Sequence, residues 1–153
     1  EQYAKYFQQE NGALVIVTRG SDGAIAFDGN SLLDHPGYAV DVVDPIGAGD
    51  AFIAGFLGGI LEGHTSREFF GLDHSSRLET LRRCLTIANV CGALTCTRRG
   101  DTAAMPTMRK VREFTGKHDA SSKQAERALA GCEVAYAKHR DQGSREAGPG
   151  RST

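Results

Sequence analysis

The sequence predicts an α/β protein, and three features indicate that class. Residues 13–18 form a continuous apolar, β-branched run, which is typical of a buried strand. A second apolar run, residues 38–43, leads into the glycine-rich segment 44–50, and a helix-like apolar run follows over residues 51–61. A strand that passes through glycines into a helix is a recurring unit of α/β folds.

The first elements follow from local patterns. Residues 2–10 are expected to be helical, and Asn11-Gly12 forms a helix stop. The apolar run at residues 13–18 shows no alternation, so we expect a strand that is buried on both faces. Residues 19–23 are expected to form a turn.

A hairpin and a further strand are predicted before the glycine-rich segment. The apolar runs 24–27 and 31–33 flank Asp28-Gly29-Asn30, which is a strong hairpin pattern. His35-Pro36-Gly37 then interrupts the chain. The strand predicted at residues 38–43 enters the segment that we take up below.

Two capping boxes mark the helices that follow. Thr65 with Glu68 and Ser76 with Glu79 have the capping-box spacing, so helices are expected to begin at both places. Residues 94–97 either finish the second helix or begin a short strand. The buried face of that helix is predicted from apolar residues that recur at helical intervals, namely Leu78, Leu81, Leu85, Ala88 and Gly92.

The end of the chain has a different composition. A last short helix is predicted from Pro106 to Phe114, because proline is favoured in the first turn of a helix. We interpret residues 1–117 as one folded unit and residues 118–153 as a polar tail. In the tail, residues 122–140 carry one thin apolar stripe and are expected to form a solvated helix, with disorder beyond it.

The composition disfavours several kinds of partner. The chain has 153 residues, enough for one domain with a core, and its 18 Lys and Arg balance 19 Asp and Glu. A net charge near zero argues against a nucleic-acid or membrane surface. No apolar run approaches the roughly 20 residues that span a bilayer, and the first residues lack a signal-peptide pattern, so we expect a cytoplasmic protein.

The cysteines are expected to be reduced thiols without a metal or disulfide role. They form no C-x-x-C pair, and the nearest histidines show no ligand spacing. Three of the four are expected to pack as small apolar side chains. The four are Cys84, Cys91, Cys96 and Cys132.

Residues 44–52 combine an anion-binding loop with a carboxylate. Gly47, Ala48 and Gly49 are expected to present backbone N–H groups at a helix N-terminus, where the macrodipole favours negative charge. Asp50 would repel an anion there, unless its task is to take a proton from the group that attacks the anion. The combination predicts phosphoryl transfer to an alcohol, with Asp50 as general base.

Three motifs in this order resemble the pfkB, or ribokinase-like, family of carbohydrate kinases. The family signature D-[TP]-x-G-A-G-D-x-F matches residues 44–52, and T-x-G-x-x-G matches residues 18–23. Downstream, an alanine-rich helix that carries Asn89 precedes Thr97-Arg98-Arg99-Gly100, which matches T-R-x-G. The resemblance covers about residues 10–115. It implies a ribokinase-like three-layer α/β/α fold, of which this chain is the C-terminal, nucleotide-binding half.

The resemblance implies a role for each matched residue. Asp50 would deprotonate the acceptor hydroxyl, while the N–H groups of Gly47, Ala48 and Gly49 would stabilise the transferred phosphoryl group. Asn89 would lie beside the adenine. The residues implied to contact the phosphates and ribose of the nucleotide are Thr18, Gly20, Ser21 and Gly23.

The resemblance also implies cofactors and a class of acceptor. ATP would be bound with Mg²⁺, because the charge on the phosphates must be offset during transfer. Asp44 matches a carboxylate that in many members helps to hold a monovalent cation such as K⁺, although Ile46 and Asp101 depart from the family pattern there. The acceptor would be a sugar or sugar acid. The pair Asp44-Pro45 leans toward 2-keto-3-deoxygluconate kinases, while fructokinases and ribokinases stay open.

Structural explanations compete with these roles. Gly47-Ala48-Gly49 could be only a tight crossing into a helix, residues 18–23 an ordinary turn, and Asn89 an exposed polar residue. Asp44 could serve only as a cap. Close helix packing, rather than a site, is the better explanation for Gly55, Gly58 and Gly59.

The family pattern places a sugar-binding half and a β-sheet lid ahead of these motifs, where this chain has only about ten residues. In-line positioning of the acceptor and exclusion of water would come from that half. Two hypotheses follow. The chain is the ATP-binding and catalytic part of a kinase, with a missing N-terminal half or a homo-oligomer as partner, or it is a non-catalytic remnant. The remnant would bind nucleotide weakly or associate through an exposed sheet edge.

Overall fold

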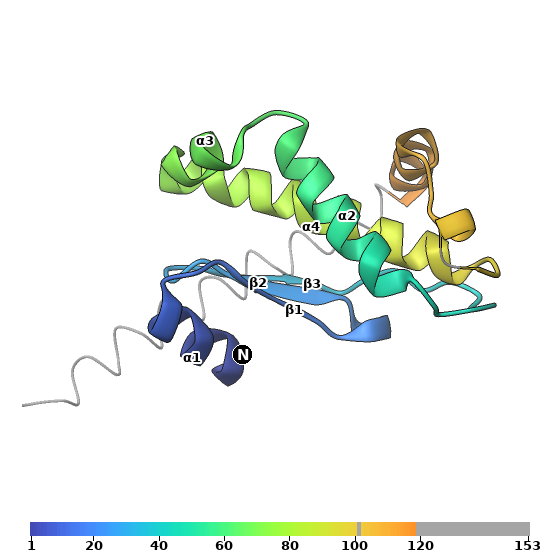
Figure 1. Cartoon of the computed structure of the whole chain (residues 1–153), viewed down its shortest axis with the longest axis horizontal. Helices are drawn as coiled ribbons and strands as arrows, with labels where there is room; N and C mark the ends of the chain where they lie inside the picture. The colour runs from blue at the N-terminus through green and yellow to red at the C-terminus, as the bar shows by residue number, and fades with distance from the viewer. Residues whose placement is uncertain (101, 119–153) are drawn as a thin grey trace, which may run out of the picture.

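The fold is a three-stranded sheet with helices on both faces (Figure 1). This computed structural model describes residues 1–100 and 102–118. Helix α1 (Gln2–Asn11) covers one face of the sheet, while α2 (Ala48–Leu61) and α4 (His74–Cys96) lie side by side over the other. This layering confirms the predicted α/β class and its three layers.

The sheet is an antiparallel meander. Strand β1 (Val15–Thr18) pairs with β2 (Ala24–Phe27), which pairs with β3 (Leu32–His35). Strand β2 is therefore central and fully buried, whereas β1 has a partner on one side only among the described residues. The predicted strand at residues 13–18 is formed over Val15–Thr18, but the expectation that it is buried on both faces is wrong. It is an edge strand that is half-buried, with Thr18 exposed.

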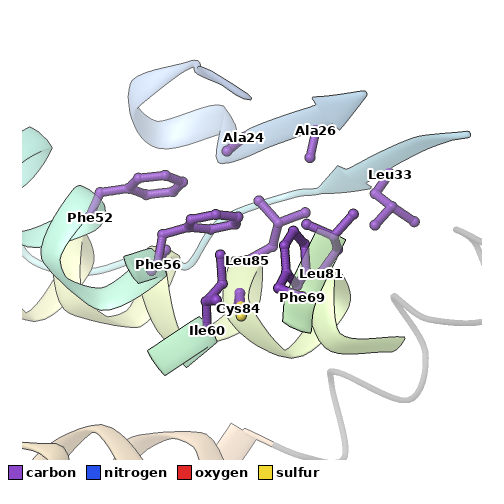
Figure 2. Packing of buried hydrophobic residues seen from close by; sticks show 11 residues of the cluster. Ala24, Ala26, Leu33, Phe52, Phe56, Ile60, Phe69, Leu81, Cys84 and Leu85 are labelled. Carbon is purple, nitrogen blue, oxygen red and sulfur yellow. The ribbon is translucent and has the colours of Figure 1, made fainter. Parts of the chain in front are cut away.

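Alternate residues of β2 face opposite layers, as the pleat of a strand requires. Ala24 and Ala26 belong to the core formed with α2 and α4 (Figure 2). Ile25 and Phe27 instead pack with Ala4 of α1 on the other face. The small side chains of Ala24 and Ala26 let α2 and α4 pack close to the sheet. Strand β2 thus separates the core under α2 and α4 from a smaller core under α1.

The turn at Asp28-Gly29-Asn30 is formed as predicted. One carboxylate oxygen of Asp28 accepts the backbone N–H groups of Asn30 and Ser31, at 3.0 Å and 2.8 Å. The other oxygen lies 3.4 Å from Nε of Arg77 in α4. Because the Asp28 side chain is almost fully buried, this ion pair fixes the tip of the hairpin to α4.

The strand predicted at residues 38–43 is not formed. The segment pairs with no strand in the described part of the chain, and Val42 and Val43 are exposed. Its end is held by α4 instead, since the N–H groups of Val43 and Asp44 donate to the carbonyl of Cys96 at 2.8 Å and 3.1 Å. An apolar run becomes a strand only where a neighbouring strand offers its backbone, and no strand among the described residues does so here.

One of the two predicted capping boxes is correct. Helix α3 (Ser66–Gly71) begins with the reciprocal Thr65–Glu68 hydrogen bonds. The box predicted at Ser76 is wrong, because α4 begins earlier, at His74, with Asp73 as its N-cap. The Asp73 carboxylate accepts from the hydroxyl and N–H groups of Ser75 and Ser76, and these bonds hold its pKa well below the usual range.

The last described elements complete the helical layer. Helix α4 continues to Cys96, so residues 94–96 finish that helix rather than begin a strand. A 3₁₀ turn, η2 (Thr102–Ala104), precedes helical residues 108–118, which begin after Pro106 and pass the predicted end at Phe114. The predicted polar tail lies outside the described residues, except for His118.

Glycines in α2 create its contact with α4. A Cβ atom on Gly55 would lie 2.7 Å from Sγ of Cys91, and one on Gly59 would lie 3.0 Å from Sγ of Cys84. Gly58 points to open space, so the predicted close packing is confirmed for Gly55 and Gly59 and wrong for Gly58.

Gly55→Ala is expected to destabilise the chain by about 1–2 kcal/mol, because overpacking outweighs the gain in helix propensity. Gly58→Ala is the matched control in the same helix, because no atom of the described residues lies within 4 Å of its Cβ position. It should stabilise the chain by up to about 1 kcal/mol. Urea unfolding followed by circular dichroism gives both values. Equal effects of the two substitutions would contradict the close contact between α2 and α4.

The cysteines in the described part of the chain form no disulfide with one another. Cys84 and Cys91 are buried and Cys96 is half-buried. Burial raises the pKa of Cys84 to about 11, so this thiol is not poised to react at neutral pH. Among residues 1–100 and 102–118, no cluster of His, Cys, Asp and Glu could hold a metal ion, and no helix is long and apolar enough to cross a membrane.

Candidate active site

The glycine-rich segment turns the chain into α2 and leaves the first turn of that helix open. Gly47 is the N-cap residue in the left-handed region, with φ +80°, and no side chain in the described part of the chain caps the helix. The N–H of Ala51 closes the first turn on the Gly47 carbonyl at 2.9 Å, while the N–H of Ala48 makes a longer bond of 3.3 Å to the Pro45 carbonyl. The N–H groups of Gly49 and Asp50 precede the first possible helical acceptor, so this positive end can receive an anion.

Asp50 lies in the first turn of α2 and is exposed. The residues that follow it, Ala51 and Phe52, are buried and anchor the turn. Helix α4 supports this end of α2 at Gly92, where a Cβ atom would lie 3.3 Å from the Ala48 carbonyl oxygen. The carboxylate of Asp50 is therefore held on a rigid element and faces solvent.

Asp44 joins two of the three motifs. One carboxylate oxygen accepts the N–H of Ile46 at 3.0 Å, and the other accepts the N–H of Gly100 at 3.2 Å. The side chain thus ties the loop before α2 to the loop after α4, which carries the T-R-x-G sequence. Neither bond caps a helix, because Ile46 and Gly100 lie outside the helices and no side chain among the described residues caps α2. The cation role stays a prediction that also involves Asp101, outside the described residues.

The Thr18–Gly23 motif forms a compact exposed turn. It contains the 3₁₀ helix η1 (Gly20–Asp22) and is closed by the Arg19 N–H, which donates to the Gly23 carbonyl at 2.7 Å. Thr18, Gly20 and Ser21 are exposed, as a contact with a nucleotide would require. Gly23 is buried against the backbone of residues 35–37.

Arg19 is a positioning residue that the sequence interpretation missed. Its guanidinium pairs with the carboxylate of Asp34, and it donates to the Asp22 carbonyl at 2.8 Å. These bonds hold the turn against the end of β3. The sequence carries a signal for this ion pair, because the residues at the ends of β1 and β3, Arg19 and Asp34, have opposite charges. A three-stranded meander brings these two strand ends to the same end of the sheet.

His35 also helps to hold the Thr18–Gly23 turn, since its backbone packs against Gly23. Its Nδ1 accepts the N–H of Gly37 at 3.0 Å, which requires the neutral ring. Burial lowers the pKa of His35 to about 4, and the carboxylate of Asp34 opposes this only in part. The ring therefore stays uncharged at neutral pH.

This arrangement predicts that stability falls as the pH is lowered from about 6.5 to about 4. In that window the unfolded chain binds a proton at His35 that the native chain does not bind, so the expected loss reaches about 3 kcal/mol. Urea unfolding at a series of pH values measures it. His35→Gln, which keeps an acceptor for Gly37, should flatten this part of the curve, and an unchanged slope in that variant would assign the effect elsewhere.

Asn89 is buried in α4, so its interpretation as an exposed polar residue is wrong. Its side-chain amide donates to the Leu85 carbonyl at 2.8 Å, one turn earlier in the helix. No hydrogen bond links Asn89 or the Thr18–Gly23 turn to residues 47–50 within the described residues. The structure thus joins the signature to the T-R-x-G loop directly, while the contacts of Asn89 and of the turn with a nucleotide stay predictions.

The chain matches the model of the pfkB family carbohydrate kinases over residues 1–108. It is 32% identical over 118 residues to the aminoimidazole riboside kinase of Salmonella typhimurium, a match that covers 76% of this chain and 34% of the relative. The chain therefore spans about a third of the length of that curated relative.

Solved structures of sugar kinases share the fold. A double mutant of the Vibrio cholerae fructokinase, with fructose, ADP and potassium ion bound, is 33% identical with a TM-score of 0.54, over 66% of this chain and 30% of that one. An Escherichia coli structure described as a ribokinase II, in complex with ATP and Mg²⁺, is 30% identical with a TM-score of 0.62, over 76% of this chain and 33% of that one. Together with the three motifs and the open N-terminus of α2, these matches show that the chain belongs to the pfkB family of carbohydrate kinases.

Proposed function

We propose that this chain carries the ATP site, the anion hole and the catalytic base of a kinase that phosphorylates a hydroxyl group of a sugar or sugar acid. The observation that carries the proposal is the first turn of α2. Its uncapped N–H groups and the exposed carboxylate of Asp50 lie within one helical turn. An anion site beside a proton acceptor is what phosphoryl transfer to an alcohol needs.

The roles divide among the elements that surround this turn. The N–H groups of Gly47, Ala48 and Gly49 stabilise the negative charge of the transferred phosphoryl group, for which the Ala48 N–H exchanges its long bond to the Pro45 carbonyl for one to the phosphoryl oxygen. Asp50 takes the proton of the acceptor hydroxyl. Asp44 keeps the loop at Gly100 beside the anion hole through its hydrogen bond.

The nucleotide site is proposed on two further elements. The exposed residues of the turn, Thr18, Gly20 and Ser21, contact the phosphates and ribose, with Gly23 fixing the backbone path. Contact of Asn89 with the adenine belongs to the same proposal, and it requires exposure of a side chain that is buried here and donates to the Leu85 carbonyl. Mg²⁺ accompanies ATP and offsets the phosphate charge, and similar proteins have been solved with ATP and Mg²⁺ or with ADP and potassium ion. A monovalent cation near Asp44 belongs to the same proposal.

A second candidate is a non-catalytic remnant that binds nucleotide or associates through the sheet. The unpaired outer edge of β1 in the described part of the chain favours it, because such an edge can pair with another strand. Transfer activity separates the two candidates.

The test measures ATP·Mg²⁺ binding by calorimetry and phosphate transfer from labelled ATP to fructose, ribose and 2-keto-3-deoxygluconate. It uses residues 1–153 alone and joined to the part of the Vibrio cholerae fructokinase that lies outside its match to this chain. We expect ATP binding by both forms and sugar-dependent transfer by the joined form. ATP binding without transfer in either form would overturn the kinase proposal in favour of the remnant.

A further inference from the structure

Helix α4 holds the glycine-rich segment at both of its ends. The carbonyl of Cys96 accepts the N–H groups of Val43 and Asp44, at 2.8 Å and 3.1 Å, where the segment begins. At the other end, where α2 starts, a Cβ atom on Gly92 would lie 3.3 Å from the carbonyl oxygen of Ala48. Gly92 and Cys96 are four residues apart in one helix, so they lie on the same face of α4, about one turn apart.

One face of α4 therefore sets the span of the anion-binding loop. Only Pro45, Ile46 and Gly47 lie between the two places where the segment is held. A third contact, from the N–H of Gly100 to the carboxylate of Asp44 at 3.2 Å, fixes the loop after α4 to the same segment. The segment cannot shift relative to α4 without breaking one of these contacts, so the directions of its N–H groups depend on that helix.

The missing side chain at Gly92 allows the contact at the start of α2, which lies beside α4 (Figure 1). Glycine in the interior of a helix is destabilising relative to alanine, so helix propensity does not explain its presence there. The close approach of the Ala48 carbonyl does explain it. A methyl group at position 92 would displace this carbonyl by a few tenths of an ångström, because a backbone group cannot rotate aside as a flexible side chain can.

The Ala48 carbonyl and the Gly49 N–H belong to one planar peptide unit. In a trans peptide these two groups point in opposite directions, so a carbonyl directed at α4 aims the Gly49 N–H away from that helix. A displacement of the carbonyl must therefore turn the N–H with it. Donors stabilise a developing negative charge only when they lie within hydrogen-bonding distance of the position that the charge will occupy.

We propose that Gly92 is a positioning residue for the anion hole. The space left by its missing side chain lets the Ala48 carbonyl lie against α4, which directs the Gly49 N–H at the transferred phosphoryl group. This inference rests on the proposed function and extends it to a residue outside the signature segment. Gly92 acts through the Ala48–Gly49 peptide unit and not by contact with the phosphate.

Gly92→Ala in the joined protein tests the inference. We expect kcat to fall about three- to tenfold, since a misplacement of about 1 Å can cost roughly 10²-fold and the displacement here is smaller. The KM for ATP should change by less than about twofold, because the interaction that is weakened belongs to the transition state.

Gly55→Ala is the matched control, because it adds the same methyl group to the same pair of helices. Its Cβ position is even closer to α4, 2.7 Å from Sγ of Cys91, but lies six residues beyond Gly49 in α2. It should cause the larger loss of stability in urea unfolding and yet leave kcat within about twofold. An equal fall of kcat in both variants would assign the effect to helix packing and overturn the inference. A raised KM at unchanged kcat in Gly92→Ala would overturn it as well.

A second measurement uses residues 1–153 alone and does not depend on transfer. The Ala51 N–H closes the first turn of α2 on the Gly47 carbonyl, so its hydrogen exchange, followed by NMR, reports the geometry of that turn. In Gly92→Ala, the ratio of the exchange rate at Ala51 to that at Phe56, deeper in the same helix, should rise at least about threefold. An unchanged ratio would mean that Gly92 does not set the first turn, and the inference would fall.

The two proposals fail in different ways. If the unsubstituted joined protein transfers no phosphate while the exchange ratio rises in Gly92→Ala, the proposed chemistry is overturned and the hold of α4 on the first turn is kept. If the joined protein transfers phosphate and Gly92→Ala changes neither kcat nor the exchange ratio, the chemistry is kept and the positioning role is overturned.

Discussion

Asp50→Asn is expected to lower the rate of phosphoryl transfer by about 10²–10⁴-fold, because asparagine cannot accept the proton of the acceptor hydroxyl. The side chain keeps its size and its place in the first turn of α2, where it is exposed, so the fold should be kept. The affinity for ATP should be unchanged or slightly higher, since a negative charge beside the phosphates is removed. Steady-state kinetics of the joined protein and calorimetry with ATP·Mg²⁺ give the two quantities.

Asp41→Asn is the control for this substitution. Asp41 is also exposed and lies nine positions ahead of Asp50, outside the signature segment. Its replacement makes the same change in net charge and should leave transfer within about twofold. If Asp50→Asn retained more than about a third of the wild-type rate, another group would have to act as base.

Gly23→Ala is expected to cost at least about 3 kcal/mol of stability and to remove ATP binding. Gly23 has φ +79° and ψ −132°, a conformation that is accessible in practice only to glycine. A Cβ atom there would lie 2.0 Å from the carbonyl oxygen of His35 and 2.3 Å from the backbone nitrogen of Gly37. Backbone atoms cannot move aside as a flexible side chain can, so the turn must separate from the end of β3.

Gly20→Ala provides the matched comparison within the same turn. Gly20 also has a positive φ, +61°, but no atom of the described residues lies within 4 Å of its Cβ position. The expected cost is only about 1 kcal/mol, from the left-handed conformation alone. Urea unfolding and ATP calorimetry on both variants separate strain from close contact. Equal losses of stability in Gly23→Ala and Gly20→Ala would mean that the contact between Gly23 and residues 35–37 adds nothing to the cost of the substitution.

Local chemistry was predicted correctly from the sequence where a few neighbouring residues decide the outcome. The Asp28-Gly29-Asn30 turn, the Gly12 helix stop and the Thr65–Glu68 capping box all form as predicted. In each case the groups that make the bonds lie within four residues of one another. The prediction of a capping box at Ser76 is wrong because Asp73 and Ser76 are both candidate N-cap residues for the same helix. Asp73 is the N-cap, since its carboxylate accepts hydrogen bonds from Ser75 and Ser76 at once.

Segments whose conformation depends on distant partners were predicted less well. The run at residues 38–43 has the composition of a strand but meets the end of α4, where Cys96 accepts the N–H groups of Val43 and Asp44. Asn89 was interpreted from its helix alone, and its burial follows from how α4 packs. The support of the Thr18–Gly23 turn by Arg19 and Asp34 likewise joins residues 15 positions apart.

The family, the order of the motifs and the residue types at the site can all be read from the amino-acid sequence without a structure. The segment Gly47-Ala48-Gly49-Asp50 carries its chemistry in the chain itself, because a glycine N-cap and a first-turn carboxylate are local features. The hydrogen bond by which Asp44 joins this segment to Gly100, and the exposure of Ile53, Leu57 and Leu61 in the described part of the chain, are visible only in the folded molecule. Contacts across the fold depend on which elements pack together, and local propensity does not encode that choice.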